Sequence, residues 1–218
     1  MDLSTGTATP RNSDSLAEWQ ARDDLLAGVG KRYADCRLAN FKQFGSEAER
    51  VRQRAALRSL QKFCDEMTDV LESGRNLFLH GPVGNGKDHL MVAVMRIAFR
   101  YTPSCWWTNG VDIFTAMRDT MDRGETRESH TIGEYTRPQV LAISDPVPPS
   151  GRLTEYQATV LFQIIDRRYR DCKPTFVTAN FKDGKDAANR VGAQVIDRLK
   201  HGALSIHCDW PSYRETAK

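Results

Sequence analysis

The chain has 218 residues, of which 40% are hydrophobic and 27% charged, and its net charge at pH 7 is +3. This composition is typical of a globular protein with a buried core, and the length suits one mid-sized domain with a tail. The small net charge excludes a uniformly basic surface, so any nucleic-acid-binding surface must be a local patch. Five scattered cysteines without metal-binding spacing favour reduced thiols over disulfides or a zinc site. Because no signal peptide or membrane-length apolar run is recognisable, we expect a cytoplasmic protein with no membrane partner.

The N-terminus is predicted to form a short extension, residues 1–32, ahead of a main domain over 33–218. Its polar start, rich in Ser and Thr, has a composition typical of disorder. A short helix is predicted near its end, with an incomplete apolar face that includes Trp19, Leu25 and Leu26. These side chains are candidate anchors for a partner protein, and packing against their own domain explains them equally well.

A long helix is predicted next, from a capping box at Ser46 to Gly74. Apolar residues recur along it at helical spacing. Four cations recur every fourth residue and therefore share one face of the helix: Arg50, Arg54, Arg58 and Lys62. A solvated helix face is favoured for this row, and a DNA-facing ridge is the alternative.

From residue 76 onward the hydrophobic pattern alternates between strands and helices. Strands are predicted over 76–80, 104–108, 139–143, 175–180 and 203–208. Helices are predicted over 89–100, 111–121 and 187–200, with another opened by a capping box at Thr154. Such alternation predicts an α/β fold in three layers, with a five-stranded parallel sheet covered on both faces.

A glycine-rich loop, "HGPVGNGKDHL" at 80–90, lies between the first of these strands and its helix. It contains the pattern G-x-x-x-x-G-K, in which glycines let backbone N–H groups point at phosphate oxygens and the lysine reaches the β- and γ-phosphates. An ordinary glycine turn is the alternative, but the position between strand and helix favours a site for ATP or ADP. The predicted contacts are Gly81, Pro82, Val83, Gly84, Asn85, Gly86, Lys87, Asp88 and His89.

Two positions depart from the usual arrangement around Mg²⁺. The loop carries Asp88 where a hydroxyl is expected, and the strand that should end in two acids ends in Ser144 and Asp145. One hypothesis is that the two donors have exchanged places, so that Asp88, Ser144 and Asp145 hold Mg²⁺. A decayed site that binds nucleotide poorly is the alternative, and both stay open. With the exchange, ATP hydrolysis is expected to be weak, with Asp145 left to polarise the attacking water; a decayed site would hydrolyse nothing.

The assembled motifs resemble the DnaC/IstB-like helicase loaders, a branch of the AAA+ ATPases, over about residues 33–214. Besides the loop, the likeness rests on "VDIFTAMRDT", "EYQATVLFQIIDRRYRDCKPTFVTAN", "VIDRLKHG" and "WPSYR". The resemblance implies a P-loop NTPase fold and an ATP-binding DNA replication protein that delivers a replicative ring helicase to single-stranded DNA. A transposition helper of the IstB kind and a non-hydrolysing helicase or DNA adaptor remain alternatives. A virus or mobile element would suit so compact a chain, which would then act in the host cytoplasm.

The resemblance also implies roles for three polar residues. Asn180 matches the first sensor near the γ-phosphate, although a local turn bond would explain it too. Arg198 matches the arginine finger that reaches a neighbouring subunit's nucleotide in trans, which implies self-association; a pair with an acidic neighbour on the surface is the alternative. Arg214 matches a C-terminal arginine that acts as a second sensor, or else it bonds the tail structurally.

A final implication of the resemblance is an inserted helical element over about 111–137 that grips single-stranded DNA. Its candidate contacts are one aromatic and three cations: Phe114, Arg118, Arg123 and Arg127. Neighbouring acids cancel much of the charge, and an apolar residue at helical spacing, such as Phe114, is also typical of a core.

Overall fold

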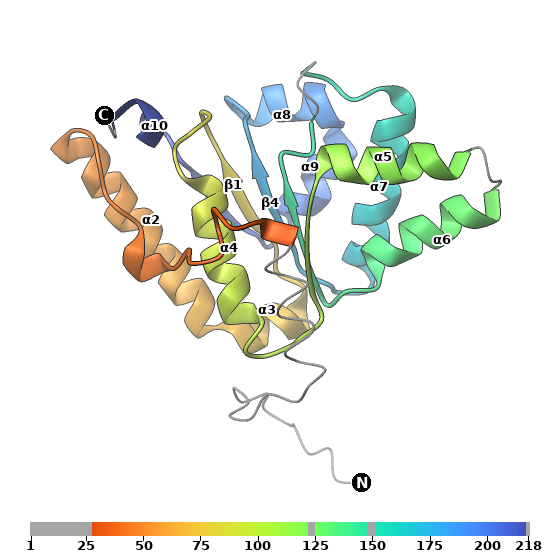
Figure 1. Ribbon diagram of the computed structural model, residues 1–218, viewed down its shortest axis with the longest axis horizontal. Helices are drawn as coiled ribbons and strands as arrows, with labels where there is room; N and C mark the ends of the chain where they lie inside the picture. Colours follow the sequence, from red (N-terminus) through yellow and green to blue (C-terminus); the bar gives the residue numbers. More distant parts are fainter. Residues whose placement is uncertain (1–27, 122–124, 148–150, 217–218) are drawn as a thin grey trace, which may run out of the picture.

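The computed structural model describes residues 28–121, 125–147 and 151–216. Its centre is a parallel sheet of five strands in the order β2-β3-β4-β1-β5. The strands are β1 (Leu77–His80), β2 (Cys105–Asn109), β3 (Val140–Ser144), β4 (Thr175–Ala179) and β5 (Leu204–His207). Helices cover both faces of this sheet (Figure 1). The predicted α/β fold with a five-stranded parallel sheet is therefore confirmed.

Each face of the sheet has its own hydrophobic core. One face packs against α2 (Glu47–Asp65), α3 (Met67–Ser73) and α4 (Lys87–Ala98). The other packs against α5 (Gly110–Met121), α6 (Glu125–Thr136), α7 (Glu155–Arg170), α8 (Gly184–Val191) and α9 (Ala193–Lys200). Along β1, Leu77 and Leu79 face the first core and Phe78 the second. Burial on both faces explains why the central strands are continuous apolar runs in the sequence.

Two predicted helices are each broken into a pair. The capping box of Ser46 with Glu49 opens α2 as predicted, but α2 ends at Asp65 and α3 follows after Glu66, whose φ is −93° and ψ 21°. The helix predicted over 187–200 is divided into α8 and α9 by Gly192, which has a φ of +98°. Only glycine adopts such a φ readily, so the break is local and costs little strain.

The connection between β2 and β3 forms a pair of helices, α5 and α6, that lie side by side beyond the sheet (Figure 1). The hydrophobic pattern predicts a helix only over 111–121, since few of the α6 residues with a described side chain are buried. Ile132 and Tyr135 supply its buried side, at 1% and 4% exposure. The inserted helical element implied by the resemblance is thus present as a helical pair.

Two short helices complete the described chain, the 3₁₀ helix η1 (Leu38–Asn40) and α10 (Tyr213–Thr216). The predicted anchors Trp19, Leu25 and Leu26 lie outside the described residues. Within the described ranges, no helix is both long and apolar enough to span a membrane.

Three of the four cations in the row on α2 are paired with nearby acids. One acid is Glu47 in the same helix, and the other is Glu66 directly after the helix. Arg50 and Arg54 both contact Glu47, at 3.3 and 2.5 Å, and Lys62 contacts Glu66 at 3.8 Å. The pairs lie at the surface, where ion pairs of this kind contribute little to stability.

Candidate nucleotide site

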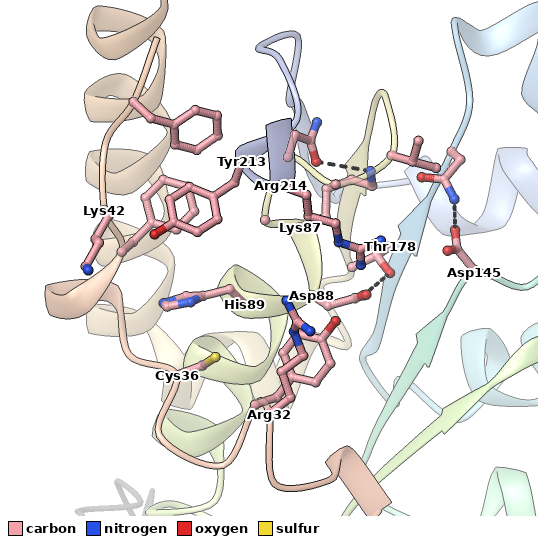
Figure 2. Close-up of a pocket in the computed structure, with 18 of the residues that line it drawn as sticks. Arg32, Cys36, Lys42, Lys87, Asp88, His89, Asp145, Thr178, Tyr213 and Arg214 are labelled. Carbon is pink, nitrogen blue, oxygen red and sulfur yellow. Dashed lines mark hydrogen bonds between the residues drawn. The ribbon is translucent and has the colours of Figure 1, made fainter. Parts of the chain in front are cut away.

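A cavity of about 370 Å³ lies at the carboxyl ends of the strands, next to the predicted phosphate-binding loop (Figure 2). Its walls come from the loop, from an N-terminal segment between Arg32 and Phe44, and from Tyr213 and Arg214 of α10. Crevices at this edge of a parallel sheet are where α/β proteins bind ligands, and pockets for small molecules measure about 300–1,000 Å³. The position and size therefore suit a nucleotide.

The loop depends on glycine at two points. Gly86 has a φ of +91° where α4 begins, a conformation that side chains disfavour. Gly81 has a φ of +139°, and a Cβ there would collide with the backbone carbonyl of Cys208. The loop is thereby folded against the end of β5, with the N-terminus of α4 facing the cavity, and a helix N-terminus favours anions.

Lys87 lies inside this loop and is 5% exposed. Its Nζ donates to the carbonyls of Gly81 and Pro82, at 3.0 and 2.6 Å, and to Oδ1 of Asn85 at 3.1 Å. Burial lowers the pKa of Lys87, since desolvation disfavours the charged form. Because these three acceptors are neutral, the lysine keeps its attraction for phosphate oxygens.

Asp88 and Ser144, which the exchange hypothesis pairs, are in direct contact. Oδ1 of Asp88 accepts hydrogen bonds from Ser144 Oγ at 2.9 Å and from Thr178 Oγ1 at 2.7 Å. Figure 2 shows the Asp88 carboxylate pointing toward Thr178, with the hydrogen bond between them dashed. Sequence reasoning missed Thr178, because only the pairing of β3 with β4 places it opposite Ser144.

Asp145 and Asn180 form a second polar pair. Asn180 Nδ2 donates to Oδ1 of Asp145 at 2.6 Å, and Asp145 has a φ of +43°, which is rare for a residue with a side chain. Burial, and then the nearby charge of Asp88, raise the pKa of Asp145, while Lys87 opposes that rise. The predicted sensor and acid are thus brought together at the cavity wall.

Arg190 of α8 supports this pair and was missed by the sequence analysis. It donates to the carbonyl of Asn180 at 2.8 Å and to that of Gly151 at 2.6 Å, and it lies over the ring of Phe181. No local pattern marks such a residue, since its role depends on how α8 packs against the end of β4.

The donors at the cavity floor fit a magnesium ion. Mg²⁺ takes oxygen ligands, typically one or two carboxylates completed by substrate phosphates and water. The carboxylates of Asp88 and Asp145 line the cavity. The hydroxyls of Ser144 and Thr178 stand behind Asp88 and donate to its Oδ1. Within the described ranges, no group of three or more His, Cys, Asp or Glu is placed to hold a metal. Two carboxylates that line a cavity of nucleotide size suit a metal that is held jointly with substrate phosphates.

Aromatic rings form the other end of the cavity, a feature that the sequence analysis did not anticipate. Phe41 contacts the ring of His89 edge-on at 5.4 Å, and Phe44 contacts Tyr213 at 5.2 Å. His89 also bonds the carbonyl of Arg37 at 2.9 Å, which ties the N-terminal segment to α4. Arg214 is exposed and lines the same space. Flat apolar walls of this kind suit a nucleotide base.

Arg198 does not line this cavity. Its Nε donates to Asp166 Oδ1 at 2.7 Å, and its guanidinium lies over the ring of Phe162, 4.8 Å from the centroid. This is the pair with an acidic neighbour that was the alternative to a role in trans. The pair is only partly exposed, with 26% of the Arg198 side chain and 21% of the Asp166 side chain accessible.

The candidate DNA contacts differ in their exposure to solvent. Phe114 is 5% exposed and packs in the second core, so its ring offers no face to a base in this conformation. Arg118 is exposed on α5. Arg123 lies outside the described residues, and Arg127 belongs to α6 without a described side chain.

Comparison with known proteins gives matches over nearly the whole chain. Residues 30–218 match the family described as IstB-like ATP binding protein. The replicative helicase loader DnaC of Escherichia coli is 26% identical over 191 residues, covering 86% of this chain and 73% of DnaC. A putative ATP-binding protein of a Mycobacterium tuberculosis insertion sequence is 29% identical over 154 residues, covering 66% of this chain and 57% of that protein.

Among solved structures, the fold is similar to the crystal structure of the DnaC helicase loader. The TM-score is 0.69 at 23% identity, over 82% of this chain and 99% of that one. The chain therefore belongs to the family of IstB-like ATP-binding proteins, with the P-loop AAA+ fold.

Proposed function

We propose that this protein is an ATP-dependent loader that delivers a replicative ring helicase to single-stranded DNA in the cytoplasm. One observation carries the proposal: the cavity with Lys87 at its floor lies in a chain whose relative over 86% of its length is the replicative helicase loader DnaC. In this role the loop binds the phosphates, and the aromatic end of the cavity takes the adenine.

Three residues would act on the bound nucleotide. Asp145 accepts a hydrogen bond from Asn180, and together they would orient a water against the γ-phosphate. Arg198 would reach the nucleotide of a neighbouring copy, since guanidinium is always charged and matches phosphate oxygens. Hydrolysis is expected to be slow, because a serine replaces the first strand acid.

We further propose that Mg²⁺ is bound through Asp88 in place of the usual loop hydroxyl. A carboxylate about 4 Å from a phosphate charge costs roughly 4 kcal/mol at an effective dielectric of about 20, which is near a thousandfold in affinity. A divalent cation between the two would reverse the sign of that term. The contact of Asp88 with Ser144 supports this exchange, since it places both donors at one point.

Calorimetry with ADP and ATP, in excess Mg²⁺ and in chelator, tests the nucleotide site and the exchange together. We expect micromolar-range binding with Mg²⁺ and a loss of about a thousandfold in chelator. Asp88→Thr should reduce this metal dependence to the level of an ordinary phosphate loop. A Lys87→Ala variant should bind neither nucleotide. Absence of binding by the unaltered protein at high Mg²⁺ would remove the nucleotide-dependent function altogether.

The loading role is tested by capture of a purified replicative helicase, with Lys87→Ala as the matched variant. We expect ATP-dependent capture of the helicase and tighter binding to single-stranded than to duplex DNA. A transposition helper is the second candidate, favoured by the family match and by the insertion-sequence relative. Capture of a transposase with preference for duplex DNA would establish that alternative. If the helicase is captured equally with and without nucleotide, and equally by Lys87→Ala, the protein is instead an adaptor.

A further inference from the structure

The contact between Asp88 and Thr178 has no counterpart in the motifs read from the sequence. Thr178 is 1% exposed on β4, and its hydroxyl donates to Asp88 Oδ1 at 2.7 Å. Ser144 is 6% exposed on β3 and donates to the same oxygen at 2.9 Å. The two hydroxyls lie 3.4 Å apart, because Ser144 and Thr178 pair directly in the β3–β4 register. One hydroxyl from β3 and one from β4 thus donate hydrogen bonds to the same oxygen of the Asp88 carboxylate.

The second oxygen of Asp88 is in a different situation. Among the residues that the structure describes, no hydrogen bond to Oδ2 and no ion pair of Asp88 is formed, although Asp88 lines the cavity beside Lys87 and Asp145. Rotation of the carboxylate about its χ2 bond is soft in general. Two hydroxyl donors on Oδ1 restrict that rotation, so the direction of Oδ2 becomes a fixed property of the site.

We propose that Thr178 is a positioning residue for Asp88, holding its carboxylate in the orientation in which it binds the Mg²⁺ of the nucleotide complex. This proposal rests on the proposed nucleotide site and deepens it. When bound, the metal supplies charge neutralisation between Asp88 and the phosphates. Thr178 contributes through geometry alone, because its hydroxyl donates its proton to Oδ1 and leaves the other oxygen available. Ser144 shares the task but donates over a longer distance.

A positioning role predicts a particular pattern of affinities. Define the metal dependence as the Kd for ADP in chelator divided by the Kd in saturating Mg²⁺. Thr178→Val keeps the shape of the side chain and removes only the hydroxyl. It should lower the metal dependence by about tenfold, the effect of losing one charge-assisted hydrogen bond, while the Kd in chelator changes little. Thr178→Ser retains the hydroxyl and should restore the dependence to within about twofold of the unaltered protein.

A double variant, Asp88→Thr with Thr178→Val, tests whether Thr178 acts through Asp88. In an Asp88→Thr background there is no carboxylate to position, so adding Thr178→Val should change the metal dependence by less than about twofold. A matched control is Thr159→Val, which removes an exposed hydroxyl on α7 that bonds the carbonyl of Glu155. Circular dichroism and thermal melts of each variant establish that the fold is retained.

The outcomes separate the two proposals. If the unaltered protein binds no ADP with Mg²⁺, the proposed function fails. If it binds with strong metal dependence but Thr178→Val weakens binding equally in Mg²⁺ and in chelator, only the positioning role fails. The same holds if the effect of Thr178→Val persists in the Asp88→Thr background. Electron paramagnetic resonance of the ADP complex with Mn²⁺ in place of Mg²⁺ gives a second measurement. The spectrum of Thr178→Val should differ from that of the unaltered protein, and the spectrum of Thr178→Ser should match that of the unaltered protein.

Discussion

At the scale of single residues, His80 ends strand β1 directly before the phosphate-binding loop, and its surroundings change the pKa of its ring. Its ring stacks on His207 of the neighbouring strand, with centroids 4.7 Å apart, and its Nδ1 is buried without a partner in the described structure. Burial, then the charges of His207, Lys200 and Lys87, lower its pKa from 6.5 to about 4. The folded protein therefore favours the neutral form of the His80 ring.

This depressed pKa makes stability depend on pH. Above pH 6.5 the unfolded and folded chains both hold a neutral His80; between 6.5 and about 4 only the unfolded chain takes up the proton, so stability falls as the pH falls. After allowance for solvent screening, we expect a loss of about 1–2 kcal/mol between about pH 8 and pH 5. Denaturant unfolding at both pH values should show this loss reduced in His80→Phe. His130→Gln, at an exposed site, should leave it unchanged; an unaltered loss in His80→Phe would assign it elsewhere.

Arg168 is a buried cation whose task is structural. It donates to the carbonyls of Tyr135, Pro138, Gln139 and Pro174 and to the hydroxyl of Thr175, and it is 0% exposed. Burial lowers its pKa to about 9. One guanidinium thus joins the segments that lead into β3 and β4, the two strands that carry Ser144 and Thr178.

Replacing this guanidinium should destabilise the fold strongly. Arg168→Met fills similar space but leaves several buried carbonyls unsatisfied, so we expect a loss of about 3–5 kcal/mol in the free energy of unfolding. Arg170→Met, on the exposed end of the same helix, should cost less than about 1 kcal/mol. Urea titrations of both variants compare them directly. Similar losses for the two would mean that the carbonyls find other donors.

At the scale of elements, the phosphate-binding loop is attached to the C-terminal segment by a run of hydrogen bonds. Asn85 Nδ2 donates to the carbonyl of Cys208 at 2.5 Å, and Trp210 Nε1 donates back to the carbonyl of Asn85 at 2.7 Å. Asn85 Oδ1 in turn accepts from Lys87 Nζ. Because bound phosphate would draw Lys87 away from Asn85, the change should reach the indole of Trp210.

Intrinsic fluorescence tests this connection. We expect ADP with Mg²⁺ to shift the tryptophan emission, and Trp210→Phe to abolish that shift and weaken ADP binding by about fivefold through loss of one hydrogen bond. Trp106→Phe is the matched control, since Trp106 lies on the edge strand β2 and stacks on Tyr135. A shift that survives in Trp210→Phe and disappears in Trp106→Phe would move the responsive element to the other side of the sheet.

Elements with strong local signals were predictable from the sequence, and elements defined by packing were not. The capping boxes at Ser46 and Thr154 and the apolar strands follow from patterns of a few residues. The breaks at Glu66 and Gly192 do not, because a helical period continues across them. In the site, Lys87, Asp88 and Ser144 were recognisable by motif. Thr178, Arg190 and the aromatic wall were not, since strand order and helix packing bring them to the cavity.

At the scale of the whole molecule, Arg198 is the residue through which one copy would complete the nucleotide site of another. Arg198 is at the surface of α9, paired with Asp166, which also contacts Arg170 at 3.1 Å. Both side chains of the pair are only partly exposed, at 26% and 21%, so the pair holds Arg198 against α7 of its own domain. A role in trans therefore requires that Arg198 leaves Asp166 when a neighbouring nucleotide is present.

A role in trans predicts different behaviour for the two partners of this pair. Arg198→Ala should bind ATP with unchanged affinity yet lose ATP-dependent self-association, measured by sedimentation, because an arginine finger interacts with the neighbour's nucleotide. Asp166→Asn frees Arg198 and should retain association. Mixing Arg198→Ala with Lys87→Ala gives the sharpest result: each copy lacks a different half of a shared site, so the mixture should associate where neither variant does alone. If the mixture fails and Asp166→Asn behaves like Arg198→Ala, then Arg198 serves only its own fold.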